Sequence, residues 1–216
     1  MREKLLFIMA LEQDKIPRPE LDLFNRLKNI KIVFDVGARI DVEYLELKPN
    51  IKLHIFEPNT EFFAELKRIV GNRENVFLNN YGLGDRECEV GYNNGHQAFI
   101  DGSSPTGEVN SILPIKTLNW YVKENKIKKI DFLKIDTEGY DYKVLIGASE
   151  IISNCKYIQY EHWNDKDCFH RLLENRFDME YIGYRNVFCM NRRLVDEKIR
   201  EELKYYIKEN KFAKLA

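Results

Sequence analysis

Two segments near the start of the chain combine a glycine turn with a carboxylate placed one helix further on. VFDVGA at residues 33–38 ends a buried strand and contains Asp35 and Gly37. HIFEP at residues 54–58 ends the next apolar strand with Glu57, twenty residues after Gly37. In doubly wound α/β folds, a carboxylate at this spacing binds ribose hydroxyls and the turn admits the rest of the cofactor. The spacing therefore predicts a nucleotide-type cofactor.

The glycine turn separates two kinds of cofactor. A dinucleotide would call for G-x-G-x-x-G, which brings the backbone close to a pyrophosphate. Here Gly37 is followed by ARID at residues 38–41, which disfavours NAD. S-adenosylmethionine has no phosphate and needs fewer glycines, and Asp35 with the turn amides would hold its amino-acid end. A cap on the following helix is the structural alternative for Asp35 and Glu57.

A third segment, FLKIDTEGYD at residues 132–141, is an apolar strand that ends in carboxylates and breaks at Gly139. Asp136 lies at the mouth of this strand, where ligands of such sheets bind, and its burial without a partner would be unfavourable. Lys134 precedes Asp136 by two residues, so we expect a salt bridge that orients this carboxylate. Glu138 either serves the site or caps the next helix.

With these motifs the chain resembles the FkbM-type S-adenosylmethionine-dependent methyltransferases. The resemblance covers roughly residues 31 to 190 and consists of five motifs in order: DVGA at 35–38, FEP at 56–58, NNYGLGD at 79–85, PIKTL at 114–118 and KIDTEG at 134–139. One position pair departs from the family. Its opening often reads D-V-G-A-N-x-G, and this chain has Arg39 and Asp41 at the asparagine and second glycine positions.

The resemblance implies an α/β fold: a single Rossmann-like class I methyltransferase domain over residues 31–216, with a mostly parallel seven-stranded sheet and an antiparallel last strand. Residues 1–30 are expected to form an N-terminal helical extension. For the cofactor, S-adenosylmethionine, the resemblance implies contacts from Asp35, Gly37, Ala38, Glu57, Asn80 and Asp136. Asn80 is expected against the adenine, although an ordinary turn also explains its segment.

Catalytic candidates lie on two neighbouring strand ends. IQYEHW at residues 158–163 ends the strand after Asp136, so Glu161 and His162 should lie beside it. Asp136 or His162 would act as a general base, with Glu138 as a further catalytic candidate. Alternatively Asp136, Glu138 and Glu161 would hold a divalent cation through their oxygens. We prefer base catalysis without a metal.

Residues 82 to 113 interrupt the regular pattern with six glycines and the SSPTG stretch at 103–107, which mark hairpins and loops, and we expect an irregular insert there that covers the acceptor. His96, Ser103 and Ser104 in this insert are candidates for substrate binding, although the polarity of a surface loop explains them equally well. Glu161 is a further candidate on the acceptor side.

Composition narrows the partners. The 216 residues include 34 Lys and Arg against 35 Asp and Glu, so the net charge of −1 favours neither nucleic acid nor an anionic membrane. Four widely spaced cysteines without zinc spacing indicate reduced, mostly buried thiols in a cytoplasmic protein. Charged residues follow the apolar run at 5–11, which favours a helix over a signal peptide, and no segment is long enough to span a membrane.

The elements that would position these residues alternate between strands and helices, which is typical of a parallel sheet covered on both faces. Expected strands are 31–36, 52–56, 75–80, 130–136 and 156–161, followed by an antiparallel pair at 179–184 and 187–191. Expected helices are near 41–48, from 59 or 60 to 70, then 116–126, 140–151, 166–175 and 196–209.

The acceptor is expected to be a small molecule or a glycan, and the resemblance favours a hydroxyl of a sugar in a surface polysaccharide or glycolipid. Methylation of a nitrogen or of a non-sugar metabolite is the enzymatic alternative. Arg39 and Asp41 suggest a third hypothesis, a catalytically silent scaffold that binds S-adenosylmethionine. The motifs describe the cofactor, so they leave the oligomeric state open.

Overall fold

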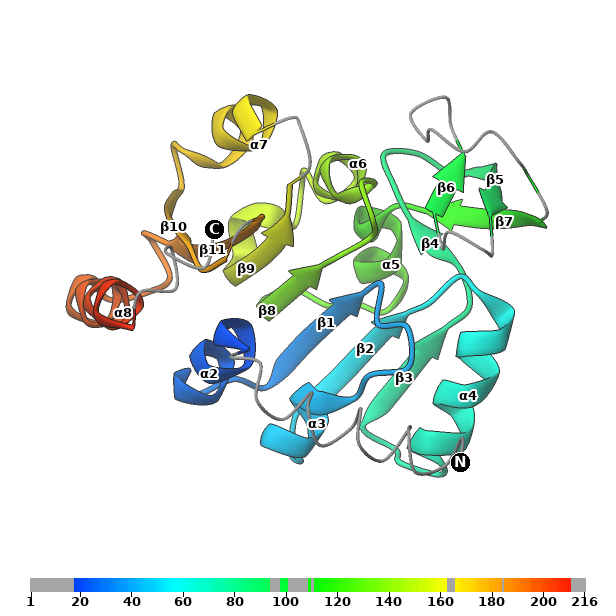
Figure 1. The fold of residues 1–216 in the computed structure, drawn as a ribbon, viewed down its shortest axis with the longest axis horizontal. Coiled ribbons are helices and arrows are strands. Elements are labelled where there is room, and N and C mark those ends of the chain that lie inside the picture. The colour runs from blue at the N-terminus through cyan, green and yellow to red at the C-terminus, as the bar shows by residue number, and fades with distance from the viewer. Residues whose placement is uncertain are drawn as a thin grey trace, which may run out of the picture.

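The computed structural model describes residues 18–93, 98–100, 109, 111–162, 166–183 and 185–210. Its main feature is a seven-stranded sheet in the order β10-β11-β9-β8-β1-β2-β3 (Figure 1). Only β11 runs against its neighbours, which confirms the expected mostly parallel sheet with an antiparallel last strand. The strands are β1 Ile32–Val36, β2 Lys52–Phe56, β3 Val76–Asn79, β8 Ile130–Ile135, β9 Cys155–Glu161, β10 Phe177–Tyr181 and β11 Asn186–Asn191.

Capping residues mark the ends of several helices. Asn59 accepts hydrogen bonds from two backbone N–H groups at the start of α4, which ends at Gly71 with φ 61°. Thr117 and Asp196 cap α5 and α8 in the same way. The helices are α2 Pro19–Arg26, α3 Glu43–Leu47, α4 Thr60–Val70, α5 Leu118–Glu124, α6 Asp141–Ile146, α7 Lys166–Leu173 and α8 Glu197–Glu209, with a 3₁₀ turn at Ile152–Asn154.

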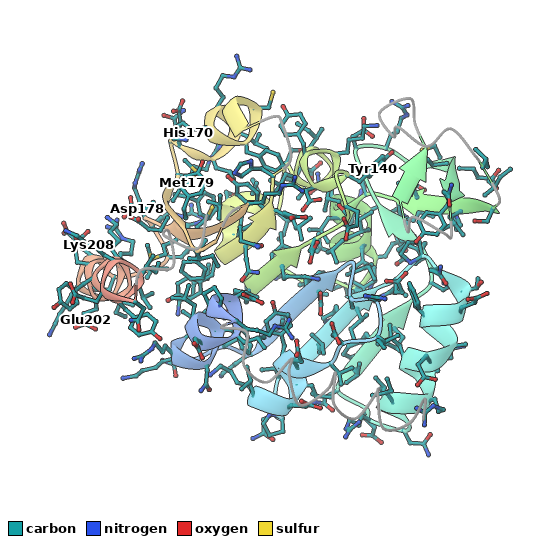
Figure 2. The ribbon with its side chains drawn as sticks, viewed as in Figure 1. Tyr140, His170, Asp178, Met179, Glu202 and Lys208 are labelled. Atoms are coloured by element: carbon teal, nitrogen blue, oxygen red, sulfur yellow. The ribbon has the colours of Figure 1, made fainter. Side chains whose placement is uncertain are left out.

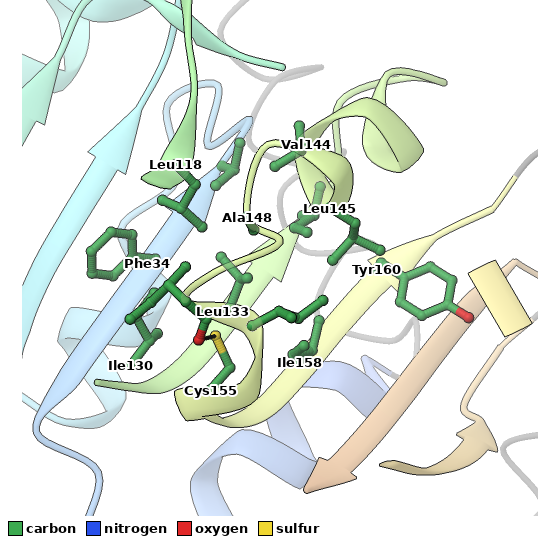
Figure 3. Close-up of a cluster of buried hydrophobic side chains, with 14 of the residues drawn as sticks. Phe34, Leu118, Ile130, Leu133, Val144, Leu145, Ala148, Cys155, Ile158 and Tyr160 are labelled. Carbon is green, nitrogen blue, oxygen red and sulfur yellow. Dashed lines mark hydrogen bonds between the residues drawn. The ribbon is translucent and has the colours of Figure 1, made fainter. Parts of the chain in front are cut away.

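Two hydrophobic layers cover the sheet. One joins α2, α3, α4 and α8 to the side of the sheet that carries Val33 and Phe132. The other joins α5, α6 and α7 to the side that carries Phe34 and Leu133 (Figure 3). Alternate residues of β1 and β8 thus face opposite layers, as the period of a strand requires.

Helix α2 lies within the segment expected as an N-terminal helical extension, and Pro19 occupies its first position, where the missing N–H does no harm. Leu23 and Phe24 are fully buried in the same cluster as Val33. Residues 1–17 lie outside the described residues. Among the helices of the described ranges, none has the length and apolar character needed to cross a membrane.

The expectation of an irregular insert at 82–113 is wrong over much of its length. A second sheet forms there in the order β4-β7-β5-β6, with strands β4 Gly82–Leu83, β5 Cys88–Asn93, β6 Ala98–Ile100 and β7 Ser111–Lys116. Val90 and Tyr92 alternate inward on β5 against Leu113 and Ile115 on β7, forming a small core. Glycines and outward polar residues obscured this two-residue period in the sequence.

The second sheet is anchored to the main domain at a close backbone contact. Tyr140, at the start of α6, enters the small core of that sheet (Figure 2). A Cβ at Gly147 would lie 1.9 Å from the carbonyl oxygen of Gly84, and one at Gly84 would lie 2.9 Å from the Tyr140 ring. Only glycines allow this approach. Gly147 also ends α6, which is shorter than the expected helix 140–151.

At the far edge of the main sheet, Asp178 on β10 faces helix α8 (Figure 2). Its carboxylate lies 2.6 Å from Arg192 and 2.9 Å from Lys204, and it also pairs with Arg200. Burial opposes ionisation, but these cations lower the pKa of Asp178 to about 2. Two of these ion pairs, from Arg200 and Lys204, hold α8 over the edge of the sheet.

The four cysteines form no disulfide. Cys155 and Cys189 are fully buried, and Cys88 and Cys168 are partly exposed. Burial raises the pKa of the Cys155 thiol well above its ordinary value, so it packs as a small apolar group. The expectation of mostly buried thiols thus holds for two of the four.

Candidate active site

A cavity of about 270 Å³ opens where the carboxyl ends of β1, β2 and β8 meet. Five of the sequence-predicted residues lie on its wall: Asp35, Gly37, Glu57, Asp136 and Glu138. These residues come from three motifs far apart in the sequence and from three adjacent strands. The parallel register brings them together, because carboxyl ends of parallel strands share one edge of the sheet.

The turn after β1 is pressed against the loop after β8. Gly37 has φ 80°, and a Cβ there would lie 1.9 Å from the carbonyl oxygen of Asp136. The Gly37 N–H donates to the carbonyl of Phe56 at 3.0 Å, and the Asp136 N–H donates to that of Val36 at 3.0 Å. Position 37 therefore requires glycine. Ala38 is buried below the turn in the main core.

Glu57 is fixed by backbone donors from both sides. One carboxylate oxygen accepts the N–H of Arg39 at 2.8 Å, and the other accepts the N–H of Asn59 at 2.8 Å. Only 5% of the residue is exposed. Burial raises the pKa of Glu57 to about 7, although both backbone donors oppose the shift. The capping role thus belongs to Asn59, and Glu57 is left to face the cavity.

Arg39, at the family's asparagine position, adopts φ 56°. This left-handed conformation is one that asparagine tolerates better than arginine does. It directs the Arg39 N–H to Glu57, while the guanidinium lies 5.5 Å from the ring of Phe62. Arg39 thus occupies a backbone conformation that suits asparagine, and its N–H holds Glu57.

Asn80 holds the backbone at Glu57 in place. Its amide donates to the carbonyl oxygens of Glu57 at 3.0 Å and Pro58 at 3.1 Å. Both donor hydrogens are thereby used to hold the loop after β2. The structure thus gives Asn80 a positioning role for Glu57, and a contact with adenine stays a prediction.

Lys134 joins the carboxylates after β1 and β8. Its ammonium lies 3.0 Å from Asp35 and 3.7 Å from Asp136, and it donates to the Gly37 carbonyl at 2.8 Å. Burial would lower the pKa of Lys134, but Asp35 and Asp136 raise it above its ordinary value, so this lysine is charged. The expected salt bridge to Asp136 is confirmed, and the closer partner is Asp35.

Asp141 ties the loop after β8 to the end of β9, a role that sequence reasoning missed. One carboxylate oxygen accepts the backbone N–H of Thr137 at 3.1 Å and its hydroxyl at 2.7 Å, and the other accepts the N–H of Glu161 at 3.2 Å. Burial raises the pKa of Asp141 to about 6, and Thr137 opposes the shift. An acidic residue in the first turn of α6 was the only local signal.

Glu138 stands in the left-handed region with φ 55°, on the wall of the cavity. For a residue with a Cβ, this conformation costs about 1–2 kcal/mol. Such strain clusters at functional sites, where the surrounding structure enforces it. Burial and the neighbouring Asp136 raise the pKa of Glu138 above its ordinary value.

The two candidates at the end of β9 occupy different surroundings. Glu161 is partly buried near Asp136 and Asp141, and burial together with these carboxylates raises its pKa to about 7. The His162 ring lies 5.8 Å from the Tyr181 ring, edge to face, and its backbone N–H donates to Arg185. The described cavity wall does not include His162.

Three predicted substrate residues, His96, Ser103 and Ser104, lie outside the described residues. The wall instead includes Tyr92 from the second sheet, Gln159 from β9 and Asn186 from β11, which sequence reasoning missed. Gln159 is the only carboxamide side chain in the strand CKYIQYE, and a carboxamide in a buried strand was a usable signal for a site residue. Across the described ranges, no three His, Cys, Asp or Glu side chains are placed to hold a metal ion.

Residues 35–186 match the model of the methyltransferase FkbM domain, which spans more than half of the chain. The chain belongs to the FkbM methyltransferase family. Among curated proteins, no relative matches the chain. The family match includes the cavity wall from Asp35 to Asn186.

Solved structures share the fold of this FkbM methyltransferase at low identity. A candidate methyltransferase from Streptococcus mutans in complex with SAH has a TM-score of 0.52 and 12% identity, covering 82% of this chain and 99% of that one. An rRNA methylase from Streptococcus thermophilus has 0.51 and 14%, covering 82% and 98%. A candidate caffeoyl-CoA O-methyltransferase from Staphylococcus aureus has 0.51 and 12%, covering 87% and 91%. These likenesses show the Rossmann-like class I fold.

S-adenosylmethionine is the methyl donor that this family implies, and the residues present fit it. Each oxygen of Glu57 accepts one backbone bond and keeps a lone pair for a ribose hydroxyl. Gly37, where a Cβ would collide with the carbonyl of Asp136, lets the turn after β1 lie directly against the loop after β8. The turn has no pyrophosphate cradle, which agrees with a cofactor that carries no phosphate.

Proposed function

We propose that this FkbM methyltransferase transfers the methyl group of S-adenosylmethionine to a hydroxyl oxygen of a small or carbohydrate acceptor, a sugar of a surface polysaccharide or glycolipid. One observation carries the proposal. Glu57, which suits a ribose, and Asp136, which suits an acceptor hydroxyl, face one cavity on either side of the Gly37 turn. The four free cysteines fit the reducing cytoplasm, where we place the reaction.

On the cofactor side, Glu57 accepts hydrogen bonds from both ribose hydroxyls, and the Gly37 turn with Asp35 receives the amino-acid end. The bound group supplies an electrophilic methyl on a sulfonium. Lys134 lies 3.0 Å from Asp35, so this carboxylate would already have a counter-charge when the cofactor is bound. A carboxylate against the sulfur would stabilise the ground state more than the transition state.

On the acceptor side, Asp136 positions the hydroxyl and takes its proton. Its side chain is 45% exposed, so it can reach a ligand, and Lys134 at 3.7 Å orients it. Much of the acceleration comes from holding the oxygen in line with the methyl, where effective molarities are large. Removal of the proton during attack makes the hydroxyl a competent nucleophile. His162 lies off the cavity wall, which favours Asp136 as the base.

The charge of the cavity supports a neutral acceptor. Carboxylates outnumber cations on the wall, and of its cations Arg18 pairs with Glu43 and Lys134 pairs with Asp35. Nucleic-acid binding depends on basic side chains that neutralise phosphates. Although one protein of similar fold is an rRNA methylase, this wall would repel a polyanion. An uncharged sugar meets no such penalty.

The experiment supplies S-adenosylmethionine and a set of glycans and monosaccharide glycosides, and measures formation of S-adenosylhomocysteine. We expect turnover that survives a chelator and is abolished in Asp136→Asn, whose cofactor affinity stays within about twofold of wild type. Cofactor binding without turnover on any acceptor would favour the silent scaffold. Turnover lost with chelator and restored by magnesium would favour a cation held by Asp136, Glu138 and Glu161.

A further inference from the structure

Gln159 belongs to a polar row that crosses the middle of the sheet. It pairs in register with Lys134 on β8, and Lys134 pairs in register with Asp35 on β1. These three residues point to the same side, because partners in register share a face. The next row on this face of the sheet lies two residues earlier on each strand. It consists of Val33, Phe132 and Tyr157, which are all in the apolar core. The polar row is therefore the floor of the cavity.

The side chain of Gln159 is buried, and its amide oxygen is unsatisfied. Only 4% of the residue is exposed, and its amide oxygen has no hydrogen-bond partner among the described residues. Lys134, its neighbour in register, directs its ammonium to Asp35, Gly37 and Asp136 instead. A buried polar atom left unpaired is destabilising, and native proteins seldom retain one without a use.

The place of Gln159 points to the acceptor. Three strand spacings of about 4.8 Å separate β9 from β2, so it lies about 14 Å across the sheet from the ribose-binding strand. Asn186 on β11 lies on the same part of the wall, in register with Glu161. Asp136, the proposed base, directly follows β8, the strand between β1 and β9. The Gln159 side of the cavity thus lies beyond the reacting centre.

We propose that Gln159 selects the acceptor by hydrogen bonding to a neutral hydroxyl next to the oxygen that is methylated. The inference rests on the proposed function and names the group that this site recognises. A carboxylate or phosphate has no proton to give to an amide oxygen, and Lys134 disfavours an ammonium beside it. A hydroxyl can donate to the unsatisfied amide oxygen of Gln159 and still accept from a second group. A buried polar pair of this kind strongly rejects analogues that lack the hydroxyl.

The first test uses the protein alone. Gln159→Met keeps the volume and removes the unsatisfied amide oxygen, so we expect the melting temperature to rise by about 2–4 °C. Asn191 is the matched control. It is a buried carboxamide on β11 whose amide donates to Ser153 and Cys155 and whose oxygen accepts from Arg193. Asn191→Leu should lower the melting temperature. A lower melting temperature for Gln159→Met would mean that the amide is structural and would overturn the proposal.

The second test titrates S-adenosylhomocysteine into wild type and Gln159→Met by calorimetry. We expect the two affinities to agree within about twofold. A loss of tenfold or more in Gln159→Met would assign Gln159 to the cofactor and overturn the proposal while leaving the proposed function intact. If the wild type does not bind S-adenosylhomocysteine, the result would instead contradict the proposed function.

The third test measures transfer of a labelled methyl group to a mixture of methyl glycosides of glucose, galactose, mannose and rhamnose. We expect Gln159→Met to raise the acceptor KM by tenfold or more, with a smaller change in kcat and none in the cofactor KM. Gln159→Glu keeps an acceptor oxygen and should recover part of the loss. An unchanged acceptor KM in Gln159→Met would also overturn the proposal.

Discussion

The ammonium of Lys134 lies 3.0 Å from the carboxylate of Asp35, its partner in register on the adjacent strand. Both side chains are nearly removed from water, at 12% and 3% exposure. Lys134→Met leaves Asp35 buried without a counter-charge, so we expect the free energy of unfolding to fall by about 3–5 kcal/mol. Chemical denaturation measures it.

The double variant Asp35→Asn, Lys134→Met is the control for this pair. It removes both charges and should recover much of the lost stability, because two neutral groups need no counter-ion. If the double variant is as unstable as the sum of the two single variants, the two side chains act independently and the pairing is wrong.

Cofactor affinity should depend on the ionisation of Glu57. Its pKa is about 7 in the free protein, and only the carboxylate form accepts from two ribose hydroxyls. We therefore expect the dissociation constant of S-adenosylmethionine to fall as pH rises from about 6 to 8, measured by calorimetry. Glu57→Gln should bind roughly tenfold more weakly at high pH and show a flat profile. Equal profiles for the two proteins would place the ribose elsewhere.

Replacing Glu138 by glycine should separate strain from function. Relief of the left-handed φ of 55° should raise the free energy of unfolding by roughly 0.5–1 kcal/mol, while loss of the carboxylate should reduce turnover. Lys126 is the matched control, because it has φ 54° and lies exposed away from the cavity wall. Lys126→Gly should gain similar stability and keep full activity. Full activity in Glu138→Gly would remove Glu138 from the site.

Buried His54 should weaken the fold in acid. Its ring stacks between Phe34 and Phe77, and its Nδ1 lies 2.8 Å from the Tyr121 hydroxyl. Burial, with a contribution from Lys52, lowers the pKa of His54 to about 4, whereas the unfolded chain titrates near 6.5. The unfolded state thus binds more protons between these values, so this residue's contribution is complete above pH 6.5 and is lost as pH falls towards 4.

The measurement compares urea unfolding of wild type and His54→Phe at several pH values. The difference between the two should change by roughly 3 kcal/mol between pH 7 and pH 4, with the wild type losing more. Carboxylates with raised pKa, such as Glu161, act in the opposite direction and cancel in this comparison. A difference that is independent of pH would show that folding leaves the pKa of His54 unchanged, and would contradict the prediction.

Sequence patterns predicted the parts of the site that depend on local spacing. Gly37 and Glu57 could be found because a turn and the next strand end are related by a fixed helix length. Gln159 and Asp141 left local signals in the sequence, but their roles could not be predicted, because they depend on register with β8 and on a backbone N–H at Glu161, both set by tertiary pairing. The second sheet was missed because Gly91, between inward Val90 and Tyr92, suggested a loop.

The backbone contact between Gly84 and Gly147 also constrains how the family can diversify. Any side chain at position 147 would collide with the Gly84 carbonyl, and one at position 84 would collide with Tyr140. A substitution at one of these three contact residues, here called the seam, therefore requires changes at the others. The outward-facing positions of the second sheet, here called its rim, carry no such constraint. Ile112 on β7, which is 66% exposed, is an example. Divergent members should therefore keep the seam and vary the rim, and exchange of 85–113 between relatives should move acceptor preference without disturbing cofactor binding.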